Sequence, residues 1–207
     1  MNLARFQILY CRACVGANAF PVVDLKIWRA LQPPAKIIAL RYIQRGPTLT
    51  LPIIIAAMIT LLVLSIGGWM TTVGPWYENL IKPSWNPPNW VFGPAWTIIL
   101  GLAAWSGVLA WTNASSDREK LLVIALFGIN IVLHMLWSPL FFNFRRPDWA
   151  LYEIPFLWLS ILALMIGLAS LSWKASWLLL PYLLWVTFAA FLNLTIVRLN
   201  APFGTTH

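Results

Sequence analysis

The residues of this chain that could take part in chemistry are isolated polar and aromatic side chains inside long apolar segments. Asn130, His134 and Ser138 recur in steps of four, which places them on one face of a helix. A second stripe, in steps of three and four, consists of Tyr182, Trp185, Ala189 and Asn193. Because polar side chains are costly at membrane depth, they indicate function better than the apolar majority does.

Two further segments supply candidates for the same site. Trp96 and Leu100 share a helical face, and Glu153 lies about one turn inside another apolar segment. If these faces met, they would line a cavity with aromatic walls and few hydrogen-bonding groups, which suits a flat, largely apolar ligand. The alternative is that the polar groups only bond one helix to the next. We favour that alternative for Asn130 and Asn193, and we expect Glu153 to be a structural partner rather than a catalytic acid.

The sequence offers one candidate for metal coordination. His134 could ligate the iron of a haem, but a lone histidine in a membrane span is more often a packing residue. Cys11 and Cys14 form a single C-x-x-C pair without a second pair, which does not define a metal or redox site. The chain has no phosphate-binding glycine loop and no paired carboxylates in its apolar segments. We therefore expect no obligatory metal or cofactor.

The composition identifies a protein that is dissolved in lipid. Hydrophobic residues make up 60% of the 207 residues and charged residues 10%, against about 25% charged residues in a typical soluble domain. Five apolar stretches each have about the 20 residues that a helix needs to cross a bilayer. Their approximate ranges are 51–73, 90–111, 121–144, 149–171 and 175–197. None alternates strictly between polar and apolar residues, so we predict an all-α, multi-pass integral membrane protein with a bundle of five transmembrane helices.

The connection between the first two spans is the longest, and it is rich in proline and tryptophan. Residues 74–89 contain Pro75, Pro83, Pro87 and Pro88. A stiff, amphipathic segment of this kind could close one end of the bundle as a lid. It could equally belong to the interfacial belt where tryptophan and tyrosine side chains gather, and the sequence leaves both interpretations open.

Residues 1–50 form a basic extension ahead of the membrane domain, 51–207. The extension holds seven Lys and Arg residues and one Asp, a net charge of +6. This charge predicts contact with anionic lipid or an influence on topology, with the amino terminus in the cytoplasm. A targeting segment is the other interpretation, although the absence of serine does not fit an organellar presequence. No domain that could present these charges to a duplex is visible, so we expect no nucleic-acid partner.

Three sequence motifs resemble those of one membrane protein family. They are WYENLIKPSWNPPNWVFGPAW at 76–96, WSPLFF at 137–142 and PYLLWVTFAAFLN at 181–193. With the five spans and the long first loop, they resemble the TspO/MBR family, the translocator proteins or tryptophan-rich sensory proteins, over about residues 51–207. The resemblance does not cover the basic extension. The family occurs in bacterial membranes and in organellar and other endomembranes, so the compartment stays open.

The resemblance implies a ligand pocket within the bundle, closed by the first loop. It also implies porphyrins such as protoporphyrin IX and haem as ligands, synthetic benzodiazepine-type ligands, and a sterol in some members. With the polar residues of the two stripes, the predicted ligand-binding set is Tyr77, Pro87, Pro88, Trp96, Leu100, His134, Trp137, Ser138, Glu153, Trp185, Ala189 and Asn193. At the water boundary, Lys82 or the pair Arg145 and Arg146 could meet the porphyrin carboxylates.

The resemblance leaves further functions open. Some members break down protoporphyrin IX in light and oxygen, and the two tryptophans implicated fall at Trp96 and Trp185, so a porphyrin-degrading enzyme is an alternative to a tetrapyrrole sensor, carrier or disposal protein. A sterol or lipid transporter is another. The sterol motif of animal members reads LNLTIVR at 192–198 and lacks its central tyrosine, which favours porphyrin over sterol. Homodimers are common in the family, and Ala103 and Gly107 could support close helix contact.

The chain also departs from the family pattern at two candidate site positions. Many members have asparagine where this chain has His134, and aspartate is frequent where it has Glu153. These departures limit what the resemblance implies about the two positions.

Overall fold

The computed structural model describes residues 50–203, and within this part the chain is helical without a strand. The predictions for the basic extension fall outside the described residues. The elements are α4 (Thr50–Met70), α5 (Pro75–Glu78), α6 (Asn89–Asn113), α7 (Asp117–Ser138), the π-helical turn η1 (Pro139–Asn143), α8 (Pro147–Ala169), α9 (Trp173–Trp177) and α10 (Leu180–Asn200). Five segments are long and apolar enough to cross a bilayer, the last of them formed by α9 and α10 together. The prediction of a five-helix membrane bundle is confirmed.

Local sequence fixes where these helices begin and end. Ser116 and Glu119 form a reciprocal capping box at the start of α7, with the Glu119 carboxylate accepting from the Ser116 N–H at 3.1 Å. Pro139 ends the regular helix because it has no N–H to donate, and the chain continues as the wider turn η1. Pro147 begins α8 from its first position, where a missing N–H is harmless.

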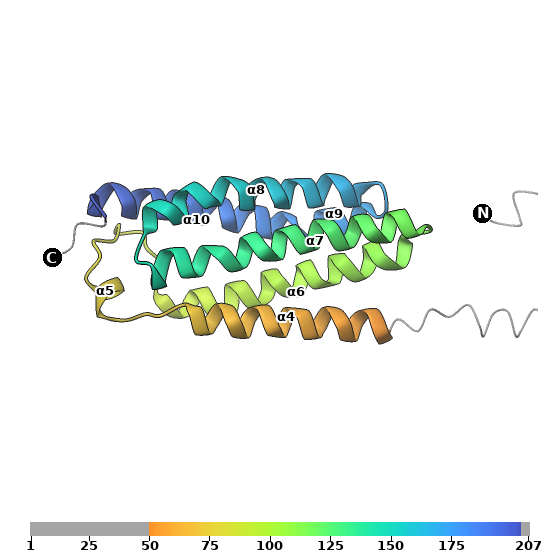
Figure 1. The fold of residues 1–207 in the computed structure, drawn as a ribbon, viewed down its shortest axis with the longest axis horizontal. Helices are drawn as coiled ribbons and strands as arrows, with labels where there is room; N and C mark the ends of the chain where they lie inside the picture. Colours follow the sequence, from red (N-terminus) through yellow and green to blue (C-terminus); the bar gives the residue numbers. More distant parts are fainter. Residues whose placement is uncertain (1–49, 204–207) are drawn as a thin grey trace, which may run out of the picture. The chain divides into compact units, whose positions relative to one another are not determined.

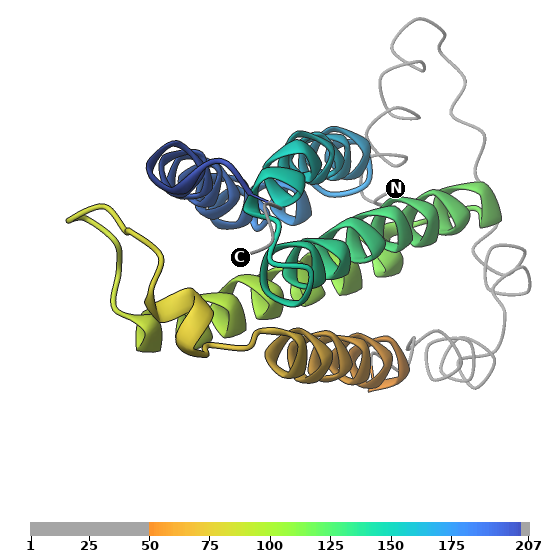
Figure 2. The ribbon, with the colours of Figure 1, turned by 60° about the vertical axis from the view of Figure 1, so that its left-hand side comes forward.

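The helices run alternately up and down, so that the α4–α6 loop, the α7–α8 turn and the end of α10 share one end of the bundle (Figure 1). Neighbouring contacts join α4 to α6, α6 to α10, α10 to α8, α8 to α7 and α7 back to α4. Figure 2 shows α8 and α10 as one pair, with α4 on the far side of α6 and α7. The helices therefore form a ring in which α8 and α4 contribute very differently to the core.

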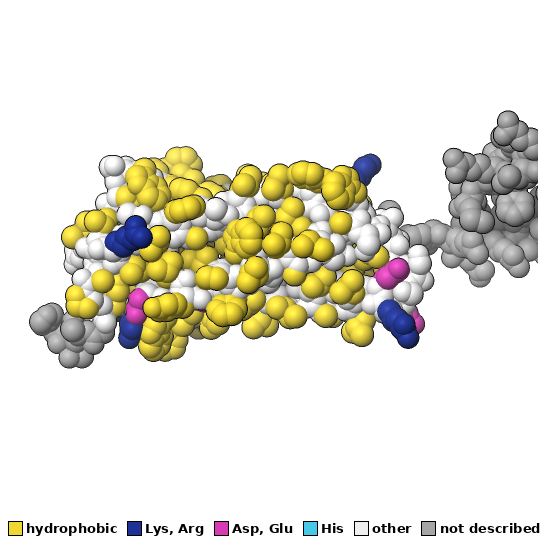
Figure 3. Space-filling view, turned by 90° about the horizontal axis from the view of Figure 1, so that it is seen from above, with side chains coloured by type: hydrophobic (Ala, Val, Ile, Leu, Met, Phe, Trp, Pro, Cys, Tyr) yellow, Lys and Arg dark blue, Asp and Glu magenta, His cyan; other side chains and the backbone are white. Residues whose placement is uncertain are grey.

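Helix α8 supplies most of the buried core, whereas α4 buries a single residue, Val63. Ile161, Leu164 and Leu168 of α8 are completely buried against the surrounding helices. Hydrophobic side chains cover the sides of the bundle, and charged side chains lie near its two ends (Figure 3). That distribution is the one expected of a protein whose sides face hydrocarbon.

Polar side chains between the helices bond to one another or to backbone carbonyls. Asn130 of α7 donates to the Ser160 hydroxyl of α8 at 2.8 Å, which confirms the interhelical interpretation of this asparagine. Ser106 donates to the Ala175 carbonyl at 2.7 Å and ties α6 to α9. These bonds satisfy polar groups that lipid could not.

The small residues of α6 are used inside the bundle. Ala103 is buried, and a Cβ added at Gly107 would lie 3.4 Å from the Phe127 ring of α7. This pair therefore supports close helix contact within one chain, and its use in contact with a second copy stays a prediction. Homodimer formation itself stays a prediction.

Candidate functional site

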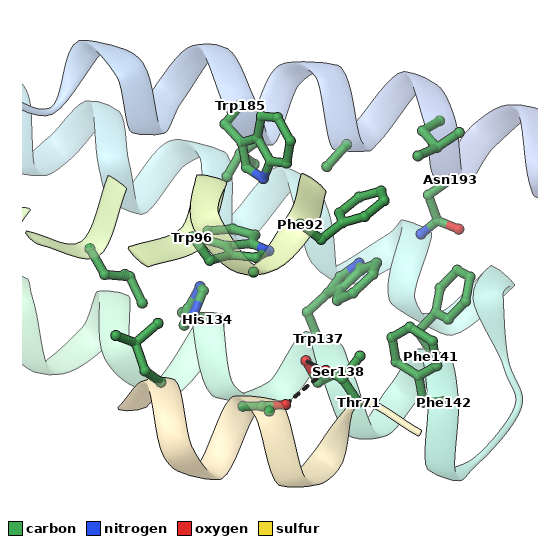
Figure 4. Close-up of a pocket in the computed structure, with 18 of the residues that line it drawn as sticks. Thr71, Phe92, Trp96, His134, Trp137, Ser138, Phe141, Phe142, Trp185 and Asn193 are labelled. Atoms are coloured by element: carbon green, nitrogen blue, oxygen red, sulfur yellow. Dashed lines mark hydrogen bonds between the residues drawn. The ribbon is translucent and has the colours of Figure 1, made fainter. Parts of the chain in front are cut away.

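A cavity of about 400 Å³ occupies the half of the bundle next to the α4–α6 loop. Its walls come from the carboxy-terminal parts of α4, α7 and α10, the amino-terminal part of α6, and from α5, η1 and α8. Figure 4 shows aromatic side chains from α6, α7, η1 and α10 around this space. Its volume is within the usual range for small-molecule sites, about 300–1,000 Å³.

The structure brings together most of the side chains predicted to bind a ligand. The predicted residues that line the cavity are Tyr77, Trp96, Leu100, His134, Trp137, Ser138, Trp185, Ala189 and Asn193. The lining does not include Pro87 and Pro88 of the loop, or Glu153 of α8. Ligand binding by any of these residues stays a prediction.

The deep part of the cavity is built around Trp96. Its ring meets the rings of His134, Tyr182 and Trp185 edge-on, with centroids 4.8, 6.0 and 6.3 Å away. The Tyr182 hydroxyl and the His134 Nδ1 atom are 3.2 Å apart and share a hydrogen bond. Edge-to-face contacts of this kind hold aromatic rings in defined orientations.

The part nearer the loop is built around Trp137 and two phenylalanines that the sequence argument did not select. The Trp137 ring stacks on Phe141 at 5.0 Å and 27°, and Phe142 stands 4.8 Å from Phe141. Both phenylalanines belong to η1, and the wider turn after Pro139 directs them inward. The signal for them was present in the WSPLFF motif, but a regular helical wheel does not apply to a π-helical turn.

Helix α4 contributes a wall of small side chains that the sequence argument also missed. Gly67, Gly68 and Thr71 line the cavity. A Cβ added at either glycine would meet nothing within 4 Å, so open space lies against this wall. Thr71 and Ser138 approach to 3.5 Å between their hydroxyl oxygens, which joins α4 weakly to α7 (Figure 4). Helix α4 carries no charged side chain, and its two glycines have no side chain to mark this wall in advance.

The α4–α6 loop contributes directly to the wall through Tyr77, which is buried against Phe141 and Phe142. Burial raises the pKa of the Tyr77 phenol above its ordinary value. The ammonium of Lys82 lies 4.4 Å from the Tyr77 ring centroid and donates to the Tyr77 carbonyl at 2.6 Å. Lys82 therefore joins two parts of the loop, its own position and Tyr77.

The far part of the same loop is fastened to α10. Asn200 binds Ile81 twice, accepting from its N–H and donating to its carbonyl, each at 2.8 Å. Trp85 packs on Phe188 with ring centroids 6.0 Å apart, whereas Trp90 is 75% exposed. Both interpretations of this region therefore apply, since Tyr77 of the loop walls the cavity while Trp90, at the start of α6, suits an interfacial belt.

No charged side chain lines the cavity in the described part of the chain. Lys82 is occupied by loop carbonyls, and the Arg146 guanidinium binds the Asp148 carboxylate and lies 4.4 Å from the Trp149 ring. Arg145 is exposed at the same end of the bundle. These three cations lie outside the cavity, so they could meet only those parts of a ligand that reach its mouth.

Three side chains of the described residues have buried polar atoms without partners. These atoms are both carboxyl oxygens of Glu153, the Nε1 atom of Trp137 and the Oδ1 atom of Asn86. The Asn193 amide, with its oxygen and nitrogen exchanged, donates to the Pro147 carbonyl and accepts from the Leu151 N–H at 3.2 Å each, an orientation that ties α10 to the first turn of α8. The same part of the chain contains no cluster of three His, Cys, Asp or Glu side chains that could hold a free metal ion.

Five helices long and apolar enough to span a membrane, around an aromatic, uncharged cavity, define a multi-pass membrane protein with an apolar cavity inside its bundle. The model of the TspO/MBR family matches residues 54–199. The chain belongs to that family, and the resemblance seen in the sequence is confirmed.

Relatives from three kinds of organism share this membrane domain. The tryptophan-rich protein TspO of Chlorobaculum tepidum is 40% identical over 125 residues, which are 60% of this chain and 79% of that protein. TspO of Archaeoglobus fulgidus is 37% identical over 151 residues, 72% of this chain and 97% of that protein. The translocator protein of Homo sapiens is 34% identical over 126 residues, 60% of this chain and 75% of that protein.

Proposed function

We propose that the cavity binds a tetrapyrrole such as protoporphyrin IX or haem and that the protein acts in tetrapyrrole sensing, transport or disposal. The observation that carries the proposal is the lining itself, which joins Trp96, Trp137 and Trp185 with phenylalanines and contains no charged side chain. Such walls suit the flat, apolar ring of a porphyrin. The porphyrin ligands implied by the family resemblance support the same choice.

The charge distribution constrains how such a ligand would lie. Two propionate carboxylates buried without cations would cost several kcal/mol, because the cavity offers only neutral groups. The ring therefore enters with its carboxylates toward the loop end, where Lys82, Arg145, Arg146 and Arg198 lie. Arginine in particular binds carboxylates through two parallel hydrogen bonds.

The direct test is titration of the purified protein with protoporphyrin IX, followed by quenching of tryptophan fluorescence and by thermal shift. We expect saturable binding that weakens by about fivefold for each of Trp96→Phe and Trp185→Phe, since an aromatic contact contributes about 1 kcal/mol. Trp105→Phe is the matched control, because Trp105 is 48% exposed and does not line the cavity. Absence of saturable binding would contradict the proposal, as would equal weakening by all three substitutions.

A porphyrin-degrading activity is the second candidate. The observation that favours it is that Trp96 and Trp185 stand 6.3 Å apart and both face the cavity. An oxidised indole beside an excited porphyrin would then have a second indole within contact range. Illumination in oxygen should bleach the porphyrin absorbance and produce new bands, and a Trp185→Phe protein that did this at the wild-type rate would exclude the role of Trp185.

A further inference from the structure

His134 occupies a position from which it can act on a ligand. It projects from α7 into the cavity wall beside Trp96 (Figure 4). Among the other polar groups of the lining, the Ser138 hydroxyl meets Thr71, whereas the Nε1 atom of Trp137 has no partner in the described residues. A polar side chain at membrane depth is costly, so the surroundings of His134 matter for its role.

The two ring nitrogens of His134 have different surroundings. Nδ1 lies 3.2 Å from the hydroxyl oxygen of Tyr182, a side chain that is 1% exposed. Nε2 has no hydrogen-bond partner in the described residues, yet it is not among the sealed, unpartnered atoms, so it is open to the cavity. When Nδ1 carries the proton and donates it to the Tyr182 oxygen, Nε2 keeps a free lone pair. A partner on the far nitrogen is the arrangement that orients metal-binding histidines.

A free metal ion does not fit this site. The described residues hold no group of three or more His, Cys, Asp or Glu side chains that could bind a free metal ion, at His134 or elsewhere. One neutral nitrogen in an apolar wall cannot repay the dehydration of a free cation. Iron that arrives inside a porphyrin already has four nitrogen ligands, and a single histidine completes its axial position.

We propose that His134 Nε2 is the axial ligand of haem iron in this cavity, with Tyr182 as the positioning residue behind it. The inference rests on the proposed tetrapyrrole function and sharpens it, because it makes the site selective for an iron-bearing ring over a metal-free one. It would not extend to family members with asparagine at this position, because an asparagine side chain is not an iron ligand.

The test compares ferric haem with metal-free protoporphyrin IX in tag-free, full-length protein. We expect the wild type to give the absorption and electron-spin-resonance spectrum of imidazole-ligated haem. His134→Asn should lose that spectrum, and its loss of affinity for haem should exceed its loss of affinity for protoporphyrin IX by at least tenfold. An unchanged helical circular-dichroism spectrum and melting temperature of the ligand-free variant show that it is folded.

The chain offers a matched control, because His207 is its only other histidine. His207→Asn should leave the haem spectrum unchanged, and ligation by Cys11 or Cys14 would be recognised by the different spectrum of a thiolate. Tyr182→Phe should keep the imidazole ligand but shift the iron–histidine stretching frequency of the ferrous protein. The reason is that the Tyr182 hydroxyl, the hydrogen-bond partner of His134 Nδ1, is lost.

The two proposals fail in different ways. If neither ligand binds the wild type, the tetrapyrrole function is wrong. If protoporphyrin IX binds but haem shows no imidazole ligand, or shows the same spectrum in His134→Asn, the function stands and the axial-ligand proposal is overturned.

Discussion

Removal of the Asn200 side chain should release the α4–α6 loop without unfolding the bundle. This amide accepts from the Ile81 N–H and donates to the Ile81 carbonyl, so one side chain holds both polar groups of a loop residue. The third bond of Asn200, to the Ile196 carbonyl at 2.8 Å, lies within α10 and does not involve the loop. Asn200→Ala therefore removes the hydrogen bonds between the loop and α10, while the Trp85–Phe188 contact and the core packing stay in place.

The size of the effect follows from the two bonds to Ile81. A net hydrogen bond contributes about 0.5–1.5 kcal/mol, and these two are exposed, so water replaces part of what is lost. The pair together is then worth about 1–2 kcal/mol. The equilibrium between the fastened and released loop should shift by about 5- to 30-fold toward release.

Amide hydrogen exchange measures this shift at the residue concerned. The Ile81 amide should lose protection by the same 5- to 30-fold factor in Asn200→Ala, and protoporphyrin IX should dissociate faster while α8 amides keep their protection. Asn113→Ala is the matched control, because Asn113 ends α6 and donates to the Leu109 carbonyl at 2.7 Å, just as Asn200 does to its own helix. Unchanged exchange at Ile81, or the same change in both variants, would refute the assignment of Asn200 as the fastening of the loop.

Three other substitutions test separate parts of the site. Gly67→Leu should place a side chain in the cavity and weaken porphyrin binding by at least tenfold without lowering the melting temperature, whereas Gly128→Leu, at an exposed glycine outside the cavity, should leave binding unchanged. Glu153→Met should raise the melting temperature, because it removes two sealed oxygens without partners, and a lower melting temperature would reveal an unseen partner. Because burial raises the pKa of Tyr77, the stability from its burial is present below pH 10 and is lost as the pH rises further. Tyr77→Phe should flatten that alkaline decline, and an equally steep decline in Tyr77→Phe would assign the loss to another group.

Periodicity and length were sufficient to predict the spans and the two stripes that face the cavity. Trp185 and Ala189 of α10 lie in the cavity lining opposite His134 and Ser138 of α7, as the steps of three and four indicated. A stripe shows which side chains share a face, but it does not show which helix that face meets. For that reason Glu153, on the same helix as the cavity residue Ile154, turned out to be sealed outside the lining.

We did not predict the cavity residues that are placed by backbone geometry, or those that form a wall because they have no side chain. Phe141 is directed inward by the turn η1, whose winding a helical wheel cannot represent. Gly67 and Gly68 form a wall because they have no side chains, so no residue type marked it. The proline pair Pro87 and Pro88 precedes α6 and sets its start, with Pro88 at the cap position, rather than lining the cavity.

The slight attachment of α4 has a consequence for how the protein holds a ligand. Of its 21 residues only Val63 is buried, although α4 forms one wall of the cavity. A flat apolar molecule between α4 and the opposite helices would supply the contacts that this helix lacks. It would complete the hydrophobic core when it binds and leave it incomplete when it dissociates. Its binding free energy would add directly to the stability of the fold, by about 2.7 kcal/mol when the free ligand is at one hundred times its Kd. In such a protein α4 is held more firmly against the bundle when the ligand is bound than when the cavity is empty. Ligand occupancy therefore changes the mobility of a helix that faces the lipid.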